Sequence, residues 1–472
     1  MRSLRSAERL GGARLTPLAL LALLALLALS TPCACSSSSN DVASHEANAG
    51  ADAQADGGAT PPADGADAAA PLDAAADADA PGLRVTTQVI TGRHRAIPGS
   101  MFGGWGPHLG HLVRRPGGEL WFVDDACDPS GPDTCDVNVN RRVDAFRLGA
   151  AGWEKRASVA LPSGVQQNTG TIVTGDAFES YGIDTASWQP VGCRIDPVTL
   201  ASSCAAVPIA LPPSTNYVGA AVSPDGWKLV WATTVVNGGG GSLHWMVDYG
   251  GGWNGPRTGG VGGYNDASYA HVAFYGGARK SELAFFAQLV SGLAPSWSFA
   301  GAVASGDAAS TNAFTFSLLP AAAGDPIAST DDLIVDEATN DTHLLARTAG
   351  GAAAYFFRPS SGAWSGALAT IAAAYRARFV HLADGRIALV YSQSGLGLAL
   401  RISMPAARVA GQPIDWGALP STAIALPPAY ASLYAIYAES ASYSRALPAT
   451  TIDLAVVAAA DEHEVLHVQI VP

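Results

Sequence analysis

Two histidines and a glutamate near the C-terminus, His463-Glu464-Val465-Leu466-His467, have the spacing at which a helix places both imidazoles on one zinc ion. The neighbouring apolar residues, Val468, Ile470 and Val471, favour a strand instead. On a strand, residues four apart lie about 13 Å from each other, which is too far for one ion with bonds of about 2 Å. We therefore expect no metal at this motif.

An acidic cluster surrounds the segment between Cys127 and Cys135 and offers oxygen ligands of the kind that calcium takes: Asp124, Asp125, Asp128, Asp133 and Asp136. The spacing and the glycine of an EF-hand loop are both missing. We therefore expect a solvated acidic loop and no cofactor, with a calcium site as the alternative.

Polar and aromatic residues also gather where loops lead into apolar runs. Imidazole, phenol and guanidinium groups can move protons or neutralise a carboxylate, so the catalytic candidates are His108, His111, Tyr269, His271 and Arg376. Aromatic rings stack on apolar sugar faces while polar groups match hydroxyls, so the ligand-binding candidates are Trp105, Asn168, Asn216, Tyr217, Asn265, Asp266, Arg378, Tyr430 and Tyr434. Gln167, Asp331 and Asp332 lie in the same loops. The alternative for the histidines is a structural hydrogen bond to a neighbouring element.

A repeat of strand-like runs positions these residues within 83–472, a stretch of about 390 residues. Paired runs flank turns such as Ser223-Pro224-Asp225-Gly226, and the first run of each unit begins near residues 111, 169, 218, 271, 333, 379 and 434. Four short strands at this period predict an all-β fold, a seven-bladed β-propeller of four-stranded antiparallel blades. The loops entering the innermost strands would then open together at one end of the central channel.

The outer strands are marked less clearly. We expect fourth strands to begin at Trp153, Trp253, Trp364 and Trp416, and that of the second unit to span residues 204–211. The seventh unit lacks a fourth run, because only 452–458 and 465–471 remain before the terminus. The run 83–90 would supply the missing outer strand and close the ring.

The turn Ser223-Pro224-Asp225-Gly226 before Leu229 resembles the hairpins of TolB-type and WD-type propeller repeats. It is also similar to the Asp-box of sialidase-like propellers, although Gly226 directly follows Asp225 and the spacing of the box is not met. These resemblances imply the fold and not an activity. In residue type alone, the loop set resembles that of propeller-fold polysaccharide lyases, which neutralise a uronate carboxylate and move a proton from the neighbouring carbon.

Four cysteines of the repeat region fall as two close pairs, Cys127 with Cys135 and Cys193 with Cys204. In an oxidising compartment such pairs predict local disulfides, although four cysteines allow three pairings. Zinc is a poor alternative because neither pair has the two-to-four-residue gap of structural zinc sites.

The N-terminus predicts where the protein works. Four arginines precede the apolar run 15–29, which is too short to span a bilayer but suits a signal peptide over residues 1–35. The run resembles those of bacterial lipoprotein signals, which implies lipidation of Cys35, or of Cys33, and an anchor in the cell envelope. Cleavage without lipidation is the alternative. Residues 36–82 carry nine acidic and no basic residues and predict a disordered linker.

Charge argues against one class of partner. The net charge is −13, of which the linker carries −9 and the signal +3, so residues 83–472 carry −7 without a basic block. Nucleic acid is therefore not expected. We expect a monomeric, anchored protein that binds an extracellular polysaccharide or an envelope protein through the channel mouth. The alternatives are a carbohydrate-active enzyme, either a polysaccharide lyase or a glycoside hydrolase, and an envelope scaffold.

Overall fold

The apolar runs of the sequence form strands in the computed structural model, which contains 29 of them in its described residues. The structure describes residues 82–91, 111–127, 141–162, 164–166, 171–184, 186–187, 189–208, 215–223, 225–234, 242–259, 266–274, 282–291, 298–307, 315–319, 324–371, 374–393, 397–404, 408–440, 449–459 and 464–472. The chain divides into the units Met1–Asp52 and Ala53–Pro472, and all described residues belong to the second. The predicted signal and, apart from Gly82, the predicted linker lie outside the described residues.

Six sheets have four strands, and the order in each runs outward from its first strand in all but one. The first sheet contains β2 (Leu112–Arg114), β3 (Leu120–Cys127), β4 (Arg141–Gly149) and β5 (Gly152–Ala160). The third contains β11 (Thr215–Val222), β12 (Lys228–Thr234), β13 (Ser242–Asp248) and β14 (Trp253–Gly259). The fourth contains β15 (Asp266–Phe274), β16 (Glu282–Ser291), β17 (Ser298–Asp307) and β18 (Thr315–Leu318).

The later sheets repeat this pattern. The fifth contains β19 (Ile327–Val335), β20 (Thr342–Thr348), β21 (Ala353–Arg358) and β22 (Ala369–Ile371). The sixth contains β23 (Ala374–His381), β24 (Ile387–Gln393), β25 (Gly397–Ile402) and β26 (Thr422–Ile424). The closing sheet contains β27 (Leu433–Ala438), β28 (Ile452–Ala458), β29 (Val465–Val471) and β1 (Arg84–Thr91).

The second sheet departs from the predicted four strands. It contains β6 (Val165–Gln166), β7 (Thr171–Thr174), β8 (Ala177–Asp184), β9 (Gln189–Ile195) and β10 (Ser202–Ala206). Both β6 and β7 pair with β8, so the innermost position is shared by two short strands. The expectation of seven four-stranded blades is therefore corrected: six sheets have that form and this sheet has five strands.

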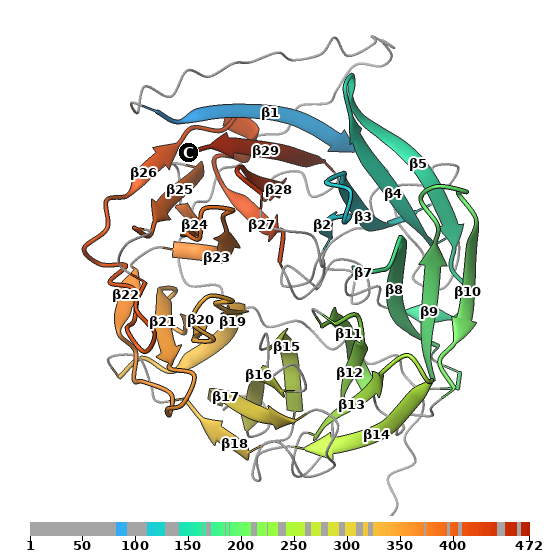
Figure 1. Cartoon of the computed structure of the whole chain (residues 1–472), viewed down its shortest axis with the longest axis horizontal. Helices are drawn as coiled ribbons and strands as arrows, with labels where there is room; N and C mark the ends of the chain where they lie inside the picture. Colours follow the sequence, from blue (N-terminus) through green and yellow to red (C-terminus); the bar gives the residue numbers. More distant parts are fainter. Residues whose placement is uncertain are drawn as a thin grey trace, which may run out of the picture. The chain divides into compact units, whose positions relative to one another are not determined.

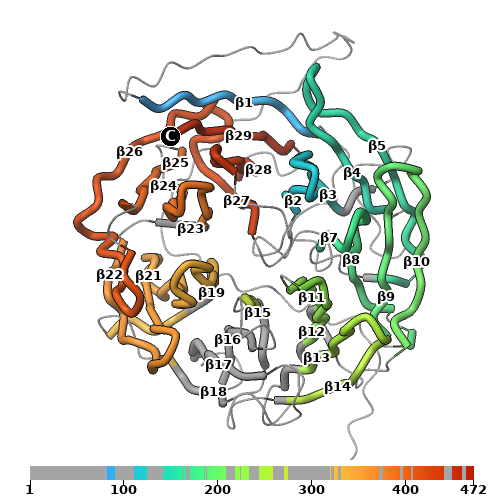
Figure 2. The backbone as a smooth tube through the Cα atoms, viewed as in Figure 1, coloured from blue at the N-terminus to red at the C-terminus, as the bar shows by residue number. Residues whose placement is uncertain are grey.

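The sheets stand side by side around a central axis, which is the arrangement of a β-propeller (Figure 1). The strands nearest the centre are β2, β7, β11, β15, β19, β23 and β27. The chain passes once round the ring, and its last strand, β29, returns to lie along β1 (Figure 2). Arg84 pairs with Val471 and Val89 with Leu466 in an antiparallel register, so the predicted closure by the N-terminal run is confirmed. The described residues contain one 3-10 helix, η3 (Pro428–Tyr430), and no helix long and apolar enough to cross a membrane.

Two of the four tryptophan predictions are wrong. Trp153 and Trp253 lie at the starts of β5 and β14, as expected. Trp364 and Trp416 instead precede β22 and β26, which begin at Ala369 and Thr422. Trp416 is fully buried and packs against Phe379, so its apolar ring serves the core between two sheets rather than an outer strand.

Apolar side chains that alternate along the inner strands fill the space between neighbouring sheets. In β23, Phe379 joins the core shared with the fifth sheet, whereas the next residue, Val380, joins the core shared with the closing sheet. This alternation follows from the two-residue period of a strand. The sixth sheet is therefore buried on both faces by its neighbours.

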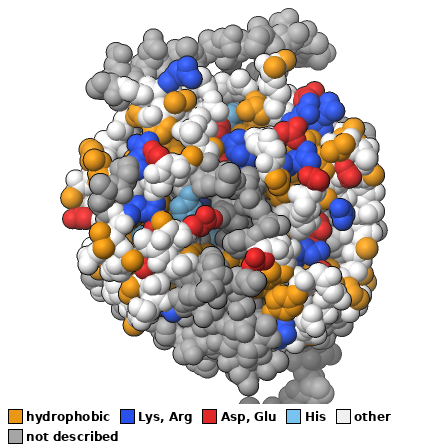
Figure 3. All heavy atoms as spheres, viewed as in Figure 1, with side chains coloured by type: hydrophobic (Ala, Val, Ile, Leu, Met, Phe, Trp, Pro, Cys, Tyr) orange, Lys and Arg blue, Asp and Glu red, His pale blue; other side chains and the backbone are white. Residues whose placement is uncertain are grey.

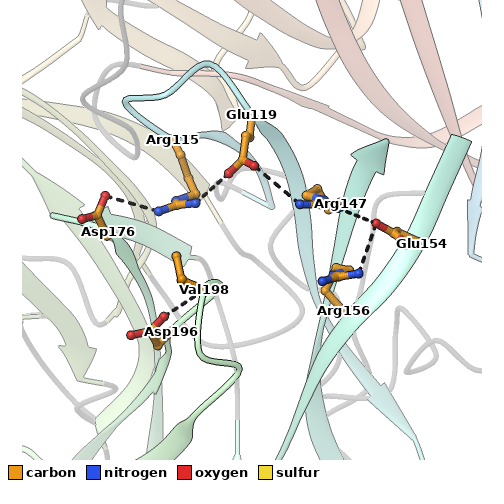
Figure 4. Close-up of polar contacts among 8 residues, drawn as sticks. All are labelled: Arg115, Glu119, Arg147, Glu154, Arg156, Asp176, Asp196 and Val198. Atoms are coloured by element: carbon orange, nitrogen blue, oxygen red, sulfur yellow. Dashed lines mark hydrogen bonds and ion pairs between the residues drawn. The ribbon is translucent and has the colours of Figure 1, made fainter. Parts of the chain in front are cut away.

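Ion pairs link the first and second sheets at the surface (Figure 4). Arg115 binds Glu119 at 2.6 Å within the first sheet and Asp176 at 3.3 Å in the turn of the second. Glu154 accepts a hydrogen bond from Arg147 at 2.7 Å, which lowers the pKa of its carboxyl group. Figure 3 shows acidic and basic side chains interspersed over the described part of one face of the ring, without a basic stripe.

Candidate functional site

Five innermost strands carry an irregularity of register near their N-terminal ends. The shifts lie between Thr215 and Val218, Ser268 and His271, Thr330 and Asp332, Tyr375 and Arg378, and Leu433 and Ala435. A bulge of this kind bends the strand and re-aims a side chain. We call these five segments the inner bulges. They contain or adjoin most of the described candidate residues.

Arg376 and Tyr434 form the best-defined contact of the inner bulges. Arg376 has a backbone φ of 53°, a left-handed conformation that costs energy for a residue other than glycine. Its Nε donates to the main-chain oxygen of Tyr434 at 2.7 Å, and its guanidinium carbon lies 5.5 Å from the centroid of the Tyr434 ring. Arg376 is buried while Tyr434 keeps part of its surface. The sixth sheet is thus joined to the closing sheet by a fixed pair of a cation and an aromatic ring.

Arg378 connects three sheets through main-chain oxygens. Its Nε donates to Ile436 at 2.9 Å in the closing sheet, and its Nη1 donates to Asp331 in the fifth sheet and to Ala377 at 2.8 Å. The side chain is 5% exposed. The sequence predicts that Arg378 binds a ligand. In the structure its hydrogen bonds join three sheets, which is a structural role.

Asp331 and Asp332 lie next to this arginine but differ in their partners. The carboxylate of Asp332 accepts hydrogen bonds from the main-chain N–H of Leu333 at 2.9 Å and of Phe379 at 2.8 Å. Burial raises the pKa of Asp332 to about 6, although the charge of Arg378 opposes the rise. Asp331 is fully buried, and neither of its carboxylate oxygens has a hydrogen-bond partner. An ionised carboxylate in that position is costly.

The two described histidines of the candidate set are both buried. Burial lowers the pKa of His271 to about 3, with a smaller contribution from the charge of Arg378. His111 places its Nδ1 2.9 Å from the main-chain oxygen of Val123 and 3.4 Å from the carboxylate of Asp124. Its ring packs edge-on against Tyr437 of the closing sheet, with centroids 4.6 Å apart. The His111 ring therefore joins the first sheet to the closing sheet, and the His271 ring is buried near Arg378 of the sixth sheet.

The other candidates divide into two groups. Asn216 and Tyr217 fall in β11, and Asp266 and Tyr269 fall in β15, at or beside the inner bulges. Tyr430 lies away from them, in η3, where it is part of the core between the sixth and closing sheets and its hydroxyl donates to Glu464. Outside the described residues are Trp105, His108, Gln167, Asn168 and Asn265.

The last three residues of the metal-like motif begin β29 (Val465–Val471), as predicted, and Glu464 precedes the strand. His467 Nε2 is 2.9 Å from the carboxylate of Asp453, and Glu464 accepts a hydrogen bond from the hydroxyl of Tyr430. Burial opposes ionisation of Asp453, but hydrogen bonds from His467, Thr451 and Gln469 lower its pKa to about 2. His463 lies outside the described residues.

Sequence reasoning missed the partner of this cluster. Arg114 of β2 binds Asp453 at 2.9 Å and Glu439 at 2.9 Å, which ties the first sheet to the closing sheet. Burial raises the pKa of Glu439 to about 7, against the lowering effect of Arg114. The sequence offered one signal for this cluster: Arg114 and Asp453 are charged residues within strand-like apolar runs, and Glu439 directly follows another such run.

The predicted disulfide between Cys193 and Cys204 is confirmed and joins directly opposed residues of β9 and β10. The predicted pairing of Cys127 with Cys135 lies outside the described residues, as do Asp128, Asp133 and Asp136 of the acidic cluster. Asp124 is buried beside His111, so it does not belong to a solvated loop. Among the residues that the structure describes, no group of three or more His, Cys, Asp or Glu side chains could hold a metal ion.

No protein-family model matches the chain, and no curated protein is similar to it in sequence. Its fold is similar to that of a protein of unknown function from Dyadobacter fermentans, at 13% identity and a TM-score of 0.46, covering 83% of this chain and 99% of that one. BP39L lectin from Burkholderia pseudomallei gives 14% identity and a TM-score of 0.48, covering 77% and 96%. The polysaccharide lyase Uly1 gives 10% and 0.49, covering 81% and 96%. Likeness at this level carries no inference about activity.

Proposed function

We propose that the protein binds a polysaccharide at the inner bulges, and that it does not transform it. The observation that carries this proposal is the pair of Arg376 and Tyr434, a guanidinium group fixed against an aromatic ring on neighbouring innermost strands. Aromatic faces stack on the apolar faces of sugar rings, and guanidinium groups bind carboxylates. Fixed side chains bind with a smaller loss of conformational entropy than mobile ones.

The proton-transfer chemistry of an enzyme finds less support in the same residues. A catalytic acid or base works best with a pKa near the operating pH, whereas the pKa of His271 is about 3. Asp332 has a pKa of about 6, but both of its carboxylate oxygens accept main-chain hydrogen bonds. Arg378 donates to main-chain oxygens of three sheets. A lyase or hydrolase is therefore kept as an outcome of the test.

We also propose that the protein is exported and held by a lipid on Cys35 in the cell envelope. The disulfide between Cys193 and Cys204 supports this, because disulfides persist in oxidising compartments outside the cytoplasm. Labelling of growing cells with a radioactive fatty acid tests the anchor: the wild-type protein should take up label and Cys35→Ser should not. Label retained by Cys35→Ser but lost in Cys33→Ser would move the anchor to Cys33.

Binding is tested with the purified protein on a panel of neutral and acidic polysaccharides. We expect Tyr434→Ala to weaken the best interaction about two- to tenfold, because loss of a stacked ring removes about 0.5–1.5 kcal/mol of contact energy. Tyr434→Phe should keep most of it. Tyr249→Ala is the control, because this exposed tyrosine lies in the turn after β13 and packs against Trp227.

Two outcomes would overturn the proposal. Binding that is unchanged in Tyr434→Ala, with the protein still folded, would remove the site from the inner bulges. Release of unsaturated uronate ends or of new reducing ends from any polysaccharide would replace binding with lyase or hydrolase activity.

A further inference from the structure

A cavity of about 550 Å³ lies between the fifth and sixth sheets, and none of its lining residues belongs to an inner bulge. It is bounded by the outermost strand of the fifth sheet, β22, and by β24, β25 and β26 of the sixth, which lie next to one another in Figure 1. Its volume is within the range of pockets that hold small ligands. The residues that matter for its chemistry are Thr370, Ile371, Tyr391, Gln393, Arg401 and Ser421.

Arg401 gives the cavity one positive charge. Within the described part of the chain, its guanidinium group makes a single hydrogen bond, from Nη1 to the main-chain oxygen of Trp416, and no carboxylate pairs with it. Its Nε is buried without a hydrogen-bond partner. Trp416 itself is fully buried against Phe379 and Tyr355, so the oxygen that holds Arg401 is fixed by the core. A positioned guanidinium group that lacks a carboxylate is suited to binding one from a ligand.

The remaining lining adds groups that bind hydroxyls. Gln393, Thr370 and Ser421 offer an amide and two hydroxyls. Tyr391 and Ile371 are packed in the core beneath them, and the Tyr391 hydroxyl is 2.9 Å from that of Ser421. One cation and several neutral polar groups match a sugar ring that bears a single carboxylate. A phosphate, with its higher charge, would normally meet more than one cationic side chain.

We infer that this cavity binds one uronic acid unit, with its carboxylate on Arg401 and its hydroxyls on Gln393, Thr370 and Ser421. One lining residue, Gln393, pairs with Ala374, two residues before Arg376. The inference about the cavity does not need the inner bulges, because the lining itself supplies the cation and the polar groups.

Calorimetry or ligand-observed NMR with monosaccharides tests it on the full-length purified protein. The probes are D-glucuronate and D-galacturonate, the neutral sugars glucose and galactose, and acetate as a carboxylate without a ring. We expect one of the uronates to bind at least about tenfold more tightly than the matching neutral sugar and than acetate, because only the uronate meets both the guanidinium group and the hydroxyl-binding groups.

Two variants assign the binding to the cavity. Arg401→Gln should weaken uronate binding at least about tenfold and leave any weak binding of neutral sugars unchanged. Ser421→Asp, at an exposed position, places a negative charge at the cavity and should also abolish uronate binding. It replaces the hydroxyl that contacts the Tyr391 hydroxyl, so thermal unfolding is measured beside binding. Arg386→Gln is the matched control, because Arg386 lies in the β23–β24 turn at the other end of the same sheet and pairs with Asp384.

The inference is overturned if neutral sugars bind as tightly as uronates, if no uronate binds at millimolar concentration, or if both cavity variants bind uronate like the wild type. None of these results depends on Tyr434, which is tested with polysaccharides. The experiments therefore distinguish failure of the inference about the cavity from failure of the proposed polysaccharide binding at the inner bulges.

Discussion

The Nε atom of Arg378 donates a hydrogen bond to the main-chain oxygen of Ile436, 58 residues further along the chain, at 2.9 Å. The same guanidinium group donates to Asp331 in the sheet on the other side. One buried side chain thus holds the innermost strands of three successive sheets in position. A residue that sequence analysis assigns to ligand binding is in this structure an inter-sheet connection.

We expect Arg378→Gln to lower the free energy of unfolding by about 3 kcal/mol, because it leaves buried carbonyl oxygens without their charged donor. Urea unfolding followed by tryptophan fluorescence measures the change. Arg386→Gln, which alters a partly exposed arginine in a turn of the same sheet, should change stability by less than about 0.5 kcal/mol. Equal effects of the two substitutions would contradict the connecting role of Arg378.

Asp331→Asn should raise the free energy of unfolding by about 1–3 kcal/mol. The carboxylate is fully buried and its oxygens accept no hydrogen bond, so removal of its charge lowers the cost of burial. The neighbouring Asp332→Asn is the contrast, because both of its oxygens accept main-chain hydrogen bonds and an amide can replace only one. We expect that variant to be less stable than the wild type. The explanation fails if Asp331→Asn is the more destabilising of the two.

Stability should depend on pH through His271 and His343. Burial lowers the pKa of each from 6.5 to about 3, so between these values the unfolded chain binds protons that the folded chain does not. Their contribution to stability is complete above about pH 6.5 and is lost as the pH falls toward 3. Asp332 acts oppositely, because its raised pKa of about 6 makes the folded state lose stability as the pH rises from 3.8 toward 6.

His343→Phe isolates one of these groups. Between pH 4 and 6, the free energy of unfolding of the variant should rise less steeply with pH than that of the wild type, by up to about 1.4 kcal/mol per pH unit. Chemical unfolding at several pH values measures both slopes. The substitution also removes the hydrogen bond between His343 and the Tyr355 hydroxyl, which lowers stability at every pH and leaves the difference in slope readable. Parallel curves would show that His343 does not titrate as expected.

Removal of β1 should open the ring. A chain that begins at Gly92 lacks the strand that pairs with β29 and leaves the edge of that strand exposed. We expect it to unfold at a lower temperature and to associate, whereas a chain that begins at Leu83 should remain monomeric and keep its unfolding temperature. Light scattering after gel filtration and thermal unfolding give the two readouts. Identical behaviour of the two chains would mean that β1 is not needed for closure.

Much of the architecture could be predicted from the sequence, because strands and turns depend on local chemistry. In the turn of Ser223-Pro224-Asp225-Gly226, Gly226 adopts a φ of 87° and its N–H binds the oxygen of Ser223, as the turn residues require. The closing strand and the pairing of Cys193 with Cys204 also follow from local patterns. The predicted first strands begin near His271 and Arg378, where regular pairing resumes after the inner bulges.

The bulges themselves were not predicted, because a strand bends there to fit neighbouring sheets and no residue type marks the place. Only the tertiary structure brings Arg376 to Tyr434 and Arg114 to Asp453, pairs separated by 58 and 339 residues. The burial of Trp416 and the cavity beside Arg401 both arise from the packing of the fifth sheet against the sixth. The sequence by itself determined which segments become strands and how the ring closes. The burial and partners of each polar side chain were decided by contacts between sheets, since those contacts join residues that are distant along the chain.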